Sequence, residues 1–511
     1  MRTKNSIKNG VVSVIMSIVA LIIGFFSQKV FIYVLGTEYL GLNGLYTNIL
    51  SILSVAELGF GTAIIYNLYK PVAKNDYKQI NILMNYYKKI YRIVACVIFG
   101  LGIIMIPFIP MIVGNTTISH LNILFLLSLL EVVFSYLLTY KRSILYATQK
   151  NYIVNIIHIF YLFLFNLIEI VLLILTQSYI LYLIVKIVCR CLENIAINIY
   201  VNRHYSYLQR DLTSLDDTTK KDIKTKVKGL LFHNIGSALV QGTDNIIISN
   251  MFGLTVVGLY SNYYMITNSI NGLITQLFQS ITSSVGSLLI DDNKEKSYSI
   301  YKNILFVNSF IYCFVSSCII STITVFIELW LGADYLLSNF ILITLMINFY
   351  LQGMKKTNSL FKNAAGVFYE DRYVPILESA INLVASILLG YVFGVAGVFI
   401  GTIISSMVLI LYSYPIFVYK KLFNRSYFAY LKDNLIYYFT DITLMIITFM
   451  VTSQIHLNNL FLTFCVQLIL AFIIISAYYL IFYRKRSEFI YFKNIFFDIL
   501  YSRKKQDITK I

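Results

Sequence analysis

The sequence alternates between long apolar runs and short polar segments, with a spacing that fits helices crossing a bilayer. A membrane-spanning helix needs about 20 mostly apolar residues, and fourteen runs reach this length to within a residue or two. The predicted helices cover residues 11–35, 42–68, 90–112, 118–140, 152–175, 179–201, 229–252, 257–290, 303–327, 336–354, 374–393, 395–418, 434–454 and 459–483. The 257–290 run exceeds one straight crossing, so we expect it to tilt or to leave the membrane. The pattern predicts an all-α polytopic membrane protein of about 14 transmembrane helices.

The composition leads to the same class of protein. Of the 511 residues, 58% are hydrophobic and only 13% are charged, whereas a soluble chain carries about 25% charged residues. This composition excludes a soluble enzyme that is held to the membrane by a single anchor.

Basic residues set the predicted direction of the helices. The formal net charge is +17, but lysines and arginines form short clusters between the apolar runs, as in loops that face anionic lipid. With the amino terminus in the cytoplasm, all but three of the 41 basic residues fall on the cytoplasmic side, Lys355 and Lys356 among them, and none falls in an exterior loop. We therefore expect both termini inside, an even number of spans, anionic membrane lipid as a partner, and no nucleic acid.

One long polar segment divides the sequence into two lobes. It runs from Arg203 to Lys228, between the sixth and seventh predicted helices. A shift of 217 residues aligns Gly36 with Gly253 and Gly41 with Gly258, which indicates a parallel pseudo-repeat of six helices. The predicted domains are an N-terminal lobe at 1–202, a cytoplasmic linker at 203–228, a C-terminal lobe at 229–420, an extra helix pair at 421–483 and a basic cytoplasmic tail at 484–511.

Three cations lie within predicted spans, where a charge costs about 2.5–3.5 kcal/mol at the bilayer centre. Two of them, Lys186 and Arg190, lie on the sixth helix with Glu193 on the same face. Glu169 lies opposite Lys186 across the turn at 176–178, so one interpretation is a plain ion pair between them. The other interpretation is a cationic strip that faces a central cavity, because Arg190 is too deep to reach the membrane surface easily.

Lys29 is the third cation, about 8 Å from the exterior end of the first helix. Its side chain can reach the membrane surface, which is the simplest interpretation. The repeat also places it near the level of Asp244 on the seventh helix. The two charges can pair on the exterior side, or Asp244 can bind a coupling cation while Lys29 meets an anion. Asp244, Glu169 and Glu193 are therefore our candidates for a coupling-ion or gate role.

Polar residues form stripes at helical spacing on the second, seventh and eighth predicted helices. The stripes include Thr47, Ser51 and Glu57, then Asn234 and Gln241, then Asn268, Asn271 and Gln279. Such side chains can join helices by hydrogen bonds worth about 0.6 kcal/mol each. Because the stripes occur on corresponding helices of both lobes, we favour a second interpretation, in which they line a hydrated central cavity.

Catalytic and metal-binding patterns are weak in this sequence. The five histidines are scattered, none has a cysteine or carboxylate partner at metal-ligand spacing, and no phosphate-binding glycine loop is present. The predicted exterior loops hold only Glu38, Glu328 and Asp334 as acids, whereas a membrane polymerase needs exposed catalytic groups. We expect a protein that is not an enzyme and that holds no metal and no cofactor.

The amino-terminal motifs carry a resemblance to a known family. The chain contains Arg2-Thr3-Lys4-Asn5-Ser6, Gly36-x4-Gly41-Leu42, Glu57-Leu58-Gly59-x-Gly61 and Leu68-Tyr69-Lys70-Pro71. This series resembles the opening of Wzx-type polysaccharide flippases, whose superfamily also contains multidrug-extrusion (MATE) transporters and lipid II flippases. The motif similarity lies within the first 75 residues, and the architectural match covers the whole chain.

The resemblance implies a MATE-like fold with two lobes around a central cavity, located in the bacterial plasma membrane. It also implies that an undecaprenyl-pyrophosphate-linked oligosaccharide moves from the inner to the outer leaflet by alternating access, for capsule or exopolysaccharide assembly, with a polysaccharide polymerase as a further partner. The family supplies no invariant substrate motif, so Lys29, Lys186 and Arg190 are predicted from the residues themselves as pyrophosphate ligands. The rival functions are a MATE-like cation-coupled solute or drug exporter and a membrane polysaccharide polymerase.

Overall fold

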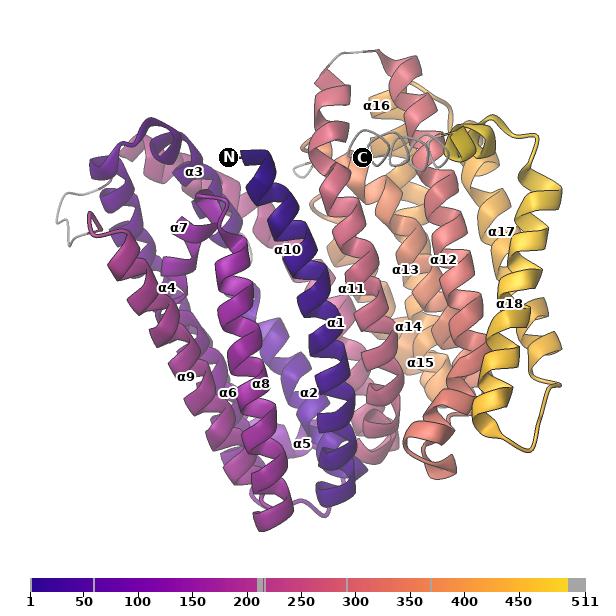
Figure 1. Cartoon of the computed structure of the whole chain (residues 1–511), viewed down its shortest axis with the longest axis horizontal. Helices are drawn as coiled ribbons and strands as arrows, with labels where there is room; N and C mark the ends of the chain where they lie inside the picture. Colours follow the sequence, from indigo (N-terminus) through magenta and orange to yellow (C-terminus); the bar gives the residue numbers. More distant parts are fainter. Residues whose placement is uncertain are drawn as a thin grey trace, which may run out of the picture. The chain divides into compact units, whose positions relative to one another are not determined.

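The computed structural model of the chain is built of long helices (Figure 1). It describes residues 2–57, 60–208, 215, 217–290, 293–367 and 370–494. Within these ranges the description leaves out the side chains at 2–14, 55–56, 62–63, 218–219, 222, 224–234, 237, 241, 280, 283 and 290.

The helices follow one another with short connections. In chain order they are α1 (Arg2–Leu35), α2 (Thr37–Leu53), η1 (Ser54–Glu57), α3 (Phe60–Lys74), α4 (Tyr77–Met105), η2 (Ile106–Phe108), α5 (Ile109–Val113), α6 (Leu121–Leu137), η3 (Thr139–Lys141), α7 (Arg142–Ala147), α8 (Asn151–Thr176), α9 (Tyr179–His204), α10 (Asp217–Phe252), α11 (Leu254–Ile290), α12 (Lys294–Trp330), η4 (Ala333–Tyr335), α13 (Asn339–Ala364), α14 (Val374–Phe393), α15 (Val395–Val408), η5 (Leu409–Ser413), η6 (Pro415–Lys420), α16 (Lys421–Phe423), α17 (Tyr427–Thr452) and α18 (Leu460–Tyr483).

Each of the fourteen predicted helices has a counterpart, and the residues that the structure describes contain no strand. The prediction of an all-α polytopic fold is therefore confirmed. Three predicted helices are interrupted. The run at 42–68 becomes α2, η1 and α3, the run at 90–112 becomes the end of α4 followed by η2 and α5, and the run at 395–418 becomes α15 followed by the π-helical turns η5 and η6.

Nine helical segments among the described residues are long and apolar enough to cross a membrane. The chain is a multi-span membrane protein. The remaining predicted spans fall outside that group: α2 and α3 are short helices of 17 and 15 residues, and α9, α10, α11 and α13 carry more polar residues. Polar residues at membrane depth are tolerated where they are buried in protein or line a water-filled space. These helices are therefore the place to look for a functional site.

Side chains and glycines define where the helices begin and end. Where the structure describes the start of a helix, six helices begin with a side-chain oxygen that accepts a hydrogen bond from a backbone N–H of the first turn, at Asp76, Ser178, Asn293, Ser338, Ser426 and Asn459. Gly36 and Gly253 separate α1 from α2 and α10 from α11, with φ of +91° and +88°. A side chain is strained at such φ values, which explains glycine at both turns.

Contacts divide the chain into two compact units. Unit 1 comprises Met1–Ser269 with Pro375–Leu383, and unit 2 comprises Ile270–Val374 with Val384–Ile511. In unit 1, α1 packs on α8, α8 on α9, α9 on α6, α6 on α4, and α2 on α10 (Figure 1). In unit 2, α12 packs on α13, α17 and α18, and α13 packs on α15. These units are defined by contacts and not by the sequence repeat, so the predicted lobe boundaries stay a prediction.

At one end of unit 1, three segments with basic residues come together. Asn81 near the start of α4 donates a hydrogen bond from Nδ2 to the carbonyl oxygen of Tyr207, beyond the end of α9, at 2.6 Å. Lys150 Nζ lies 5.3 Å from the centroid of the Tyr205 ring, and Thr148 Oγ1 lies 3.0 Å from the Tyr205 hydroxyl. The α3–α4 junction, the α7–α8 junction and the segment after α9 therefore share one end, which agrees with the prediction that all three lie on the same side of the membrane.

The opposite end of unit 1 gathers turns without basic residues. Glu38 accepts hydrogen bonds from Thr116 Oγ1 at 2.6 Å, from Thr117 Oγ1 at 2.7 Å and from the Thr117 N–H at 3.2 Å. Partial burial raises the pKa of the Glu38 carboxyl, but these hydrogen bonds outweigh burial and hold the pKa below its usual value. Asn250 Nδ2 donates to the Met111 carbonyl oxygen at 3.1 Å. The α1–α2 turn, the α5–α6 turn and the end of α10 thus meet at the end predicted to be exterior.

Two further glycines give the internal repeat a structural counterpart. A Cβ on Gly41 of α2 would lie 1.9 Å from the carbonyl oxygen of Leu254 at the start of α11. A Cβ on Gly258 of α11 would lie 2.1 Å from the carbonyl oxygen of Thr37 at the start of α2. Thr37 and Leu254 are themselves related by the 217-residue shift. The contact between the two helices is therefore reciprocal, and only glycine allows so close an approach.

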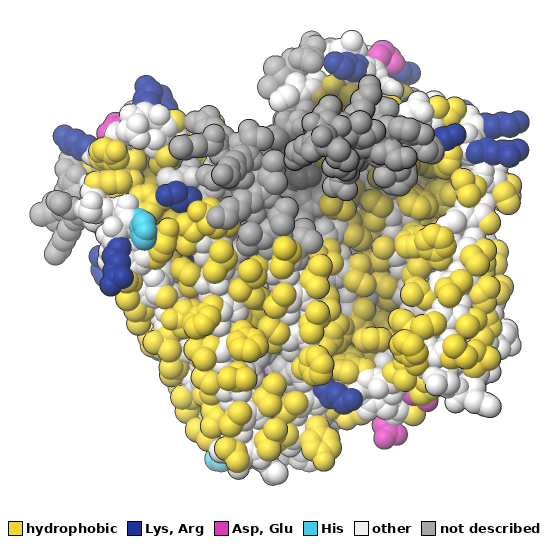
Figure 2. Space-filling view, viewed as in Figure 1, with side chains coloured by type: hydrophobic (Ala, Val, Ile, Leu, Met, Phe, Trp, Pro, Cys, Tyr) yellow, Lys and Arg dark blue, Asp and Glu magenta, His cyan; other side chains and the backbone are white. Residues whose placement is uncertain are grey.

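The outer surface of unit 1 has the character of a lipid-facing surface. On α8, exposed apolar side chains recur every three or four residues, at Phe160, Phe163, Leu167, Val171 and Ile174. Figure 2 shows hydrophobic side chains over most of the visible middle of each unit, and several Lys and Arg side chains near the end of unit 1 where α3 and α7 lie. An apolar stripe of this length in contact with water would be costly, so it indicates lipid contact.

A buried carboxylate joins four helices of unit 2. Asp441 on α17 is 0% exposed. Its Oδ2 accepts hydrogen bonds from Ser309 Oγ of α12 at 2.5 Å and from the Tyr350 hydroxyl of α13 at 2.8 Å, and its Oδ1 accepts one from the Tyr479 hydroxyl of α18 at 3.1 Å. The extra helix pair α17–α18 is therefore tied to α12 and α13 by polar bonds inside the apolar core.

We expect Asp441→Ala to destabilise unit 2. The change removes an acceptor from three buried hydroxyls, and each group left unsatisfied costs about 1–3 kcal/mol. The Tyr350 hydroxyl keeps the Tyr437 carbonyl oxygen, at 3.1 Å, as an acceptor. Ser309 and Tyr479 lie 3.0 Å apart and can partly compensate one another, so we expect a total loss on the order of 3 kcal/mol. Thermal unfolding of the purified protein in detergent measures it. Asp217→Ala, at an exposed ion pair with Lys220, is the control, and equal melting temperatures for the two variants would contradict the role of Asp441.

Helix α13 corrects one predicted boundary. The apolar run predicts a helix end at residue 354, which places Lys355 and Lys356 in a cytoplasmic loop, but α13 continues to Ala364. Lys355 is buried, with its Nζ 3.2 Å from Ser406 Oγ, and Lys362 is buried in an ion pair with Asp371. The apolar run alone misses the end of the helix because polar partners from other segments hold these lysines inside it.

Candidate functional site

Unit 1 contains a polar cavity of about 460 Å³ between α2, α6, α7 and α9. Its polar and charged lining comprises Asn43, Tyr46, Thr47, Ser51, Ser54, Glu57, Ser128, Glu131, Ser135, Tyr136, Thr139, Arg142, Lys186 and Arg190. The structure thus brings Thr47, Ser51 and Glu57, the predicted stripe of the second helix, to the same space as Lys186 and Arg190.

Arg190 lies in the wall of this cavity, between two carboxylates. Its Nε donates to Glu131 Oε1 at 3.0 Å, and its Nη1 donates to Glu193 Oε2 at 2.9 Å. Arg190 is about 17 Å along α9 from Tyr179, at 1.5 Å per residue. About 29% of its side chain stays exposed. The guanidinium is therefore fixed in position near the middle of the helix and is still open to the cavity.

Each of the two carboxylates also meets a second cation. Lys186 Nζ lies 3.9 Å from Glu131 Oε2, and Arg142 Nη2 donates to Glu193 Oε1 at 2.9 Å. This cluster combines three cations with two carboxylates, so it has a net charge of +1 when all five are ionised. We refer to these five side chains as the charge cluster.

The cavity as a whole is closer to neutral than the charge cluster. Glu57 lines it as a third carboxylate and accepts hydrogen bonds from Tyr91 and Tyr136. Two members of the charge cluster, Glu131 and Arg142, are absent from the residues predicted from the sequence. Glu131 is the one acid in the predicted span at 118–140, which is the signal that could have pointed to it. Arg142 falls in a predicted cytoplasmic loop, but it begins α7 and turns toward α9.

A smaller cavity opens on the other side of the charge cluster. It has a volume of about 100 Å³ between α6, α8 and α9 and shares Glu131, Lys186 and Arg190 with the larger one. Here His158 Nδ1 lies 3.1 Å from Glu193 Oε1. The two basic side chains of α9 therefore have open space on two sides.

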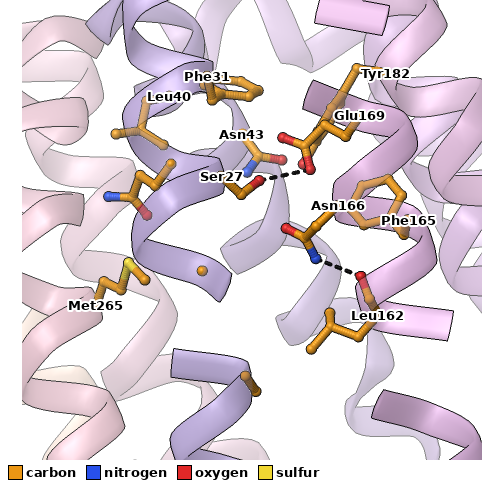
Figure 3. A pocket seen from close by; sticks show the side chains of 13 residues that line it. Ser27, Phe31, Leu40, Asn43, Leu162, Phe165, Asn166, Glu169, Tyr182 and Met265 are labelled. Atoms are coloured by element: carbon orange, nitrogen blue, oxygen red, sulfur yellow. Dashed lines mark hydrogen bonds between the residues drawn. The ribbon is translucent and has the colours of Figure 1, made fainter. Parts of the chain in front are cut away.

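A third cavity, of about 320 Å³, lies between α1, α2, α8, α9 and α11 (Figure 3). Glu169 is 3% exposed at its wall, and its Oε2 accepts a hydrogen bond from Ser27 Oγ at 2.9 Å. Figure 3 shows Ser27 pointing toward Glu169, with Asn166 and Asn43 nearby. This is a carboxylate with neutral oxygen and amide groups around it.

Glu169 and Lys186 do not form the direct ion pair that was one of the two predictions, because each has another partner. Glu169 is held by Ser27, while Lys186 is nearer to Glu131. Glu169 and Lys186 still interact electrostatically. This agrees with the expectation from helical spacing that they lie at the same depth. Helical spacing cannot show that α6 brings a closer carboxylate to Lys186.

The contacts described for this part of the chain do not include a pair between Lys29 and Asp244. Lys29 is exposed on α1 and is absent from the linings of the three cavities described above. Asp244 on α10 is half-buried and interacts electrostatically with Tyr260 and Tyr264. Exposure of Lys29 fits the interpretation in which its side chain reaches the membrane surface, and the ligand role of Lys29 stays a prediction.

The remaining polar positions are spread along α10 and α11. The side chains of Asn234 and Gln241 lie outside the described residues. Asn268 and Gln279 are exposed on α11. Asn271 accepts a hydrogen bond from the Tyr312 hydroxyl at 2.8 Å. No group of three or more His, Cys, Asp or Glu side chains that could hold a metal ion occurs in the part of the chain that the structure describes.

The arrangement of helices can be compared with that of known proteins. No protein-family model and no curated protein sequence matches the chain. Solved structures do match. A MATE-family multidrug resistance transporter of the MOP superfamily, in an inward-facing conformation, aligns with a TM-score of 0.60 and 16% identity over 78% of this chain and 95% of that one. The lipid II flippase MurJ, in an inward closed conformation, aligns with a TM-score of 0.63 and 15% identity over 92% of this chain and 98% of that one.

The chain has the fold of these MOP-superfamily transporters. A MOP-superfamily transporter from Pyrococcus furiosus also aligns, with a TM-score of 0.55 and 15% identity over 86% of this chain and 96% of that one. Its binding pocket is described as having reversed polarity. At this level of identity the likeness establishes the arrangement of the helices, and the site must be argued from its own residues.

Proposed function

We propose that the protein moves an undecaprenyl-pyrophosphate-linked oligosaccharide from the inner to the outer leaflet of the bacterial plasma membrane, for capsule or exopolysaccharide assembly. Three lines support this function: the Wzx-type motifs at the amino terminus, the fold shared with a lipid II flippase, and the charge cluster. The observation that carries most weight is Arg190, a guanidinium held near mid-helix with open space on two sides. Its planar fork of donors suits a pyrophosphate.

The charge cluster suggests how an anion is taken up and released. A pyrophosphate entering the cavity competes with Glu131 for Lys186 and Arg190, and the Lys186 contact, at 3.9 Å, is the weaker of the two. An unpaired charge is costly in a low-dielectric cavity. Because Lys186 and Arg190 are already paired with carboxylates, the site does not have this cost when no substrate is bound. The same pairing limits how tightly the anion is held, which transport requires. Lys29 stays a candidate for a separate contact.

A second function has one observation in its favour. The buried Glu169, with Ser27, Asn166 and Asn43 nearby, presents oxygen and amide groups that suit a proton or a small hard cation. Such a group fits a cation-coupled solute or drug exporter, and it also fits ion coupling of the flippase. Asp244 and Glu193 are further candidates for a coupling or gate role. An exporter of cationic drugs gains nothing from the excess of cations over carboxylates in the charge cluster.

We also propose that both termini lie in the cytoplasm, that the protein is not an enzyme and binds no cofactor, and that anionic lipid and a polysaccharide polymerase are its partners. The clustering of basic segments at one end of unit 1 supports this orientation. Residues 495–511 of the basic tail lie outside the described residues.

Reconstitution can separate the two functions. Proteoliposomes that hold a fluorescent undecaprenyl-pyrophosphate oligosaccharide in the inner leaflet should expose it to an external quencher several times faster than empty liposomes. The same vesicles should not move ethidium above background under a proton or sodium gradient. Ethidium transport without movement of the lipid-linked sugar would establish the exporter function in its place.

A further inference from the structure

We infer that unit 2 carries a second binding site, centred on Lys356 of α13, which recognises an acidic sugar of the transported oligosaccharide. This inference rests on the proposed function and deepens it by naming a substrate class. The sequence pattern places Lys356 in an ordinary cytoplasmic loop.

The first observation is the surroundings of the Lys356 ammonium group. It donates a hydrogen bond to Thr275 Oγ1 of α11 and lies 6.0 Å from the centroid of the Tyr312 ring of α12. Both neighbours are neutral, and among the described residues no carboxylate pairs with Lys356. Arg190 in unit 1, by contrast, bonds to two carboxylates. Among the described residues, no carboxylate therefore competes with a ligand for the Lys356 ammonium group.

The second observation is that neighbouring residues shape this position. A Cβ on Gly353, one turn earlier on α13, would lie 2.0 Å from Cδ1 of Tyr312. Glycine at 353 thus allows the Tyr312 ring to lie directly against α13 beside Lys356. The Tyr312 hydroxyl in turn donates to Asn271 Oδ1 of α11 at 2.8 Å. Lys356, Tyr312 and the polar face of α11 are held as one arrangement.

The third observation is open space along that face of α11. Asn271, Thr275 and Gln279 follow one another at four-residue spacings and Gly272 is next to Asn271, so all four lie on one side of the helix. A Cβ on Gly272 would meet nothing within 4 Å, and Gln279 is exposed. Amide and hydroxyl groups beside an open strip are the groups that hydrogen-bond sugar hydroxyls.

The charge count decides the kind of anion. A pyrophosphate carries several negative charges and is best held by several cations or by the fork of an arginine. Lys356 is a single point charge among neutral donors and acceptors, which suits a single carboxylate on a hydroxyl-rich ligand. A uronic acid is the sugar class with this chemistry. Lys356 lies about 26 Å along α13 from Asn339, in the half of the helix predicted to face the cytoplasm, where the substrate enters.

Ligand-detected NMR on the full-length protein in nanodiscs tests the inference. The probes are a glucuronate-containing disaccharide, its neutral glucose-containing counterpart, and inorganic phosphate as competitor. We expect the wild-type protein to bind the acidic disaccharide at least about 5-fold more tightly than the neutral one, a difference of roughly 1 kcal/mol. Lys356→Met, which keeps the apolar stem, should remove this preference, and Lys356→Arg should retain most of it. The control Lys294→Met, at an exposed position of α12, should change nothing.

Each result supports or overturns the inference. Equal binding of the two disaccharides by the wild type, or an undiminished preference in Lys356→Met, would overturn it, as would displacement of the disaccharide by phosphate at equal concentration, which would indicate a general anion site. The vesicle assay separates this failure from failure of the proposed function: movement of the lipid-linked oligosaccharide with no role for Lys356 removes only the acidic-sugar site.

Discussion

Replacing Arg190 by alanine should abolish export of the polysaccharide while leaving the protein folded in the membrane. Truncating one member of a buried, hydrogen-bonded charge pair typically costs about 2–5 kcal/mol in binding. Since about 1.4 kcal/mol is a factor of ten, transport in the vesicle assay should fall at least about 30-fold. Folding should survive because each remaining carboxylate keeps a cation: Glu131 keeps Lys186, and Glu193 keeps Arg142.

Two further variants make the Arg190 result specific. Arg190→Lys keeps the charge but not the fork of donors, so it should retain an intermediate rate. Arg425→Ala removes an arginine of similar pairing, with Glu295, at an exposed position, and should leave transport unchanged. Wild-type export from Arg190→Ala at normal protein levels would remove the charge cluster from the mechanism.

The second large effect is expected at the crossing of α2 and α11. Gly41→Ala places a Cβ 1.9 Å from a backbone oxygen of Leu254, well inside the usual carbon–oxygen contact of about 3.3 Å. The obstacle is backbone, so the two helices must move apart by more than about 1 Å, the difference between these two distances. Overpacking of this kind typically costs about 1–3 kcal/mol. We expect a lower melting temperature, and faster hydrogen exchange at the starts of α2 and α11.

The chain offers a matched control for this substitution. Gly100 lies in α4, and a Cβ added there would meet nothing within 4 Å, so Gly100→Ala makes the same chemical change without a clash and should slightly stabilise the helix. Gly258→Ala, on the other side of the crossing, should reproduce the effect of Gly41→Ala. If Gly41→Ala and Gly100→Ala exchange hydrogen and unfold alike, the close approach of α2 and α11 has no energetic importance.

The same two substitutions bear on the transport cycle. The Gly41–Gly258 crossing lies at the end of unit 1 predicted to be exterior, beside the turns that begin α2 and α11. The proposed function, with alternating access, requires this end to open and close. A methyl group at either glycine should therefore slow the vesicle assay as well as lower stability, whereas Gly100→Ala should affect neither transport nor folding adversely.

Much of the fold follows from local sequence. Apolar runs of membrane length give the fourteen helices, since a backbone in lipid must satisfy its own hydrogen bonds and a helix does so within one segment. The paired glycines also carry information beyond their turns: Gly36 and Gly253 adopt positive φ, and Gly41 and Gly258 make reciprocal contacts. The positive φ is a local property of one residue, whereas the reciprocal contact joins two helices far apart in the sequence and was indicated only by the repeat.

Helix ends are less predictable because they depend on partners. The lysines that follow residue 354 have the pattern of a loop, yet Lys355 and Lys362 are buried on α13 beside Ser406 and Asp371. A lysine is costly inside a helix bundle only while it lacks a polar partner. A sequence read one helix at a time has no access to that partner.

The sequence by itself determined the class of protein, the helices, the internal repeat and the presence of Lys186 and Arg190 inside a span. The tertiary structure decided which charges meet. In the folded protein, Arg190 pairs with Glu131 and is not part of a purely cationic strip. Glu169 accepts a hydrogen bond from Ser27, and Lys356 packs against a neutral polar face. The physical reason is the distance over which each effect acts. Hydrophobic periodicity and the backbone angles of glycine depend on a few neighbouring residues, whereas the energy of a charge depends on every helix packed around it.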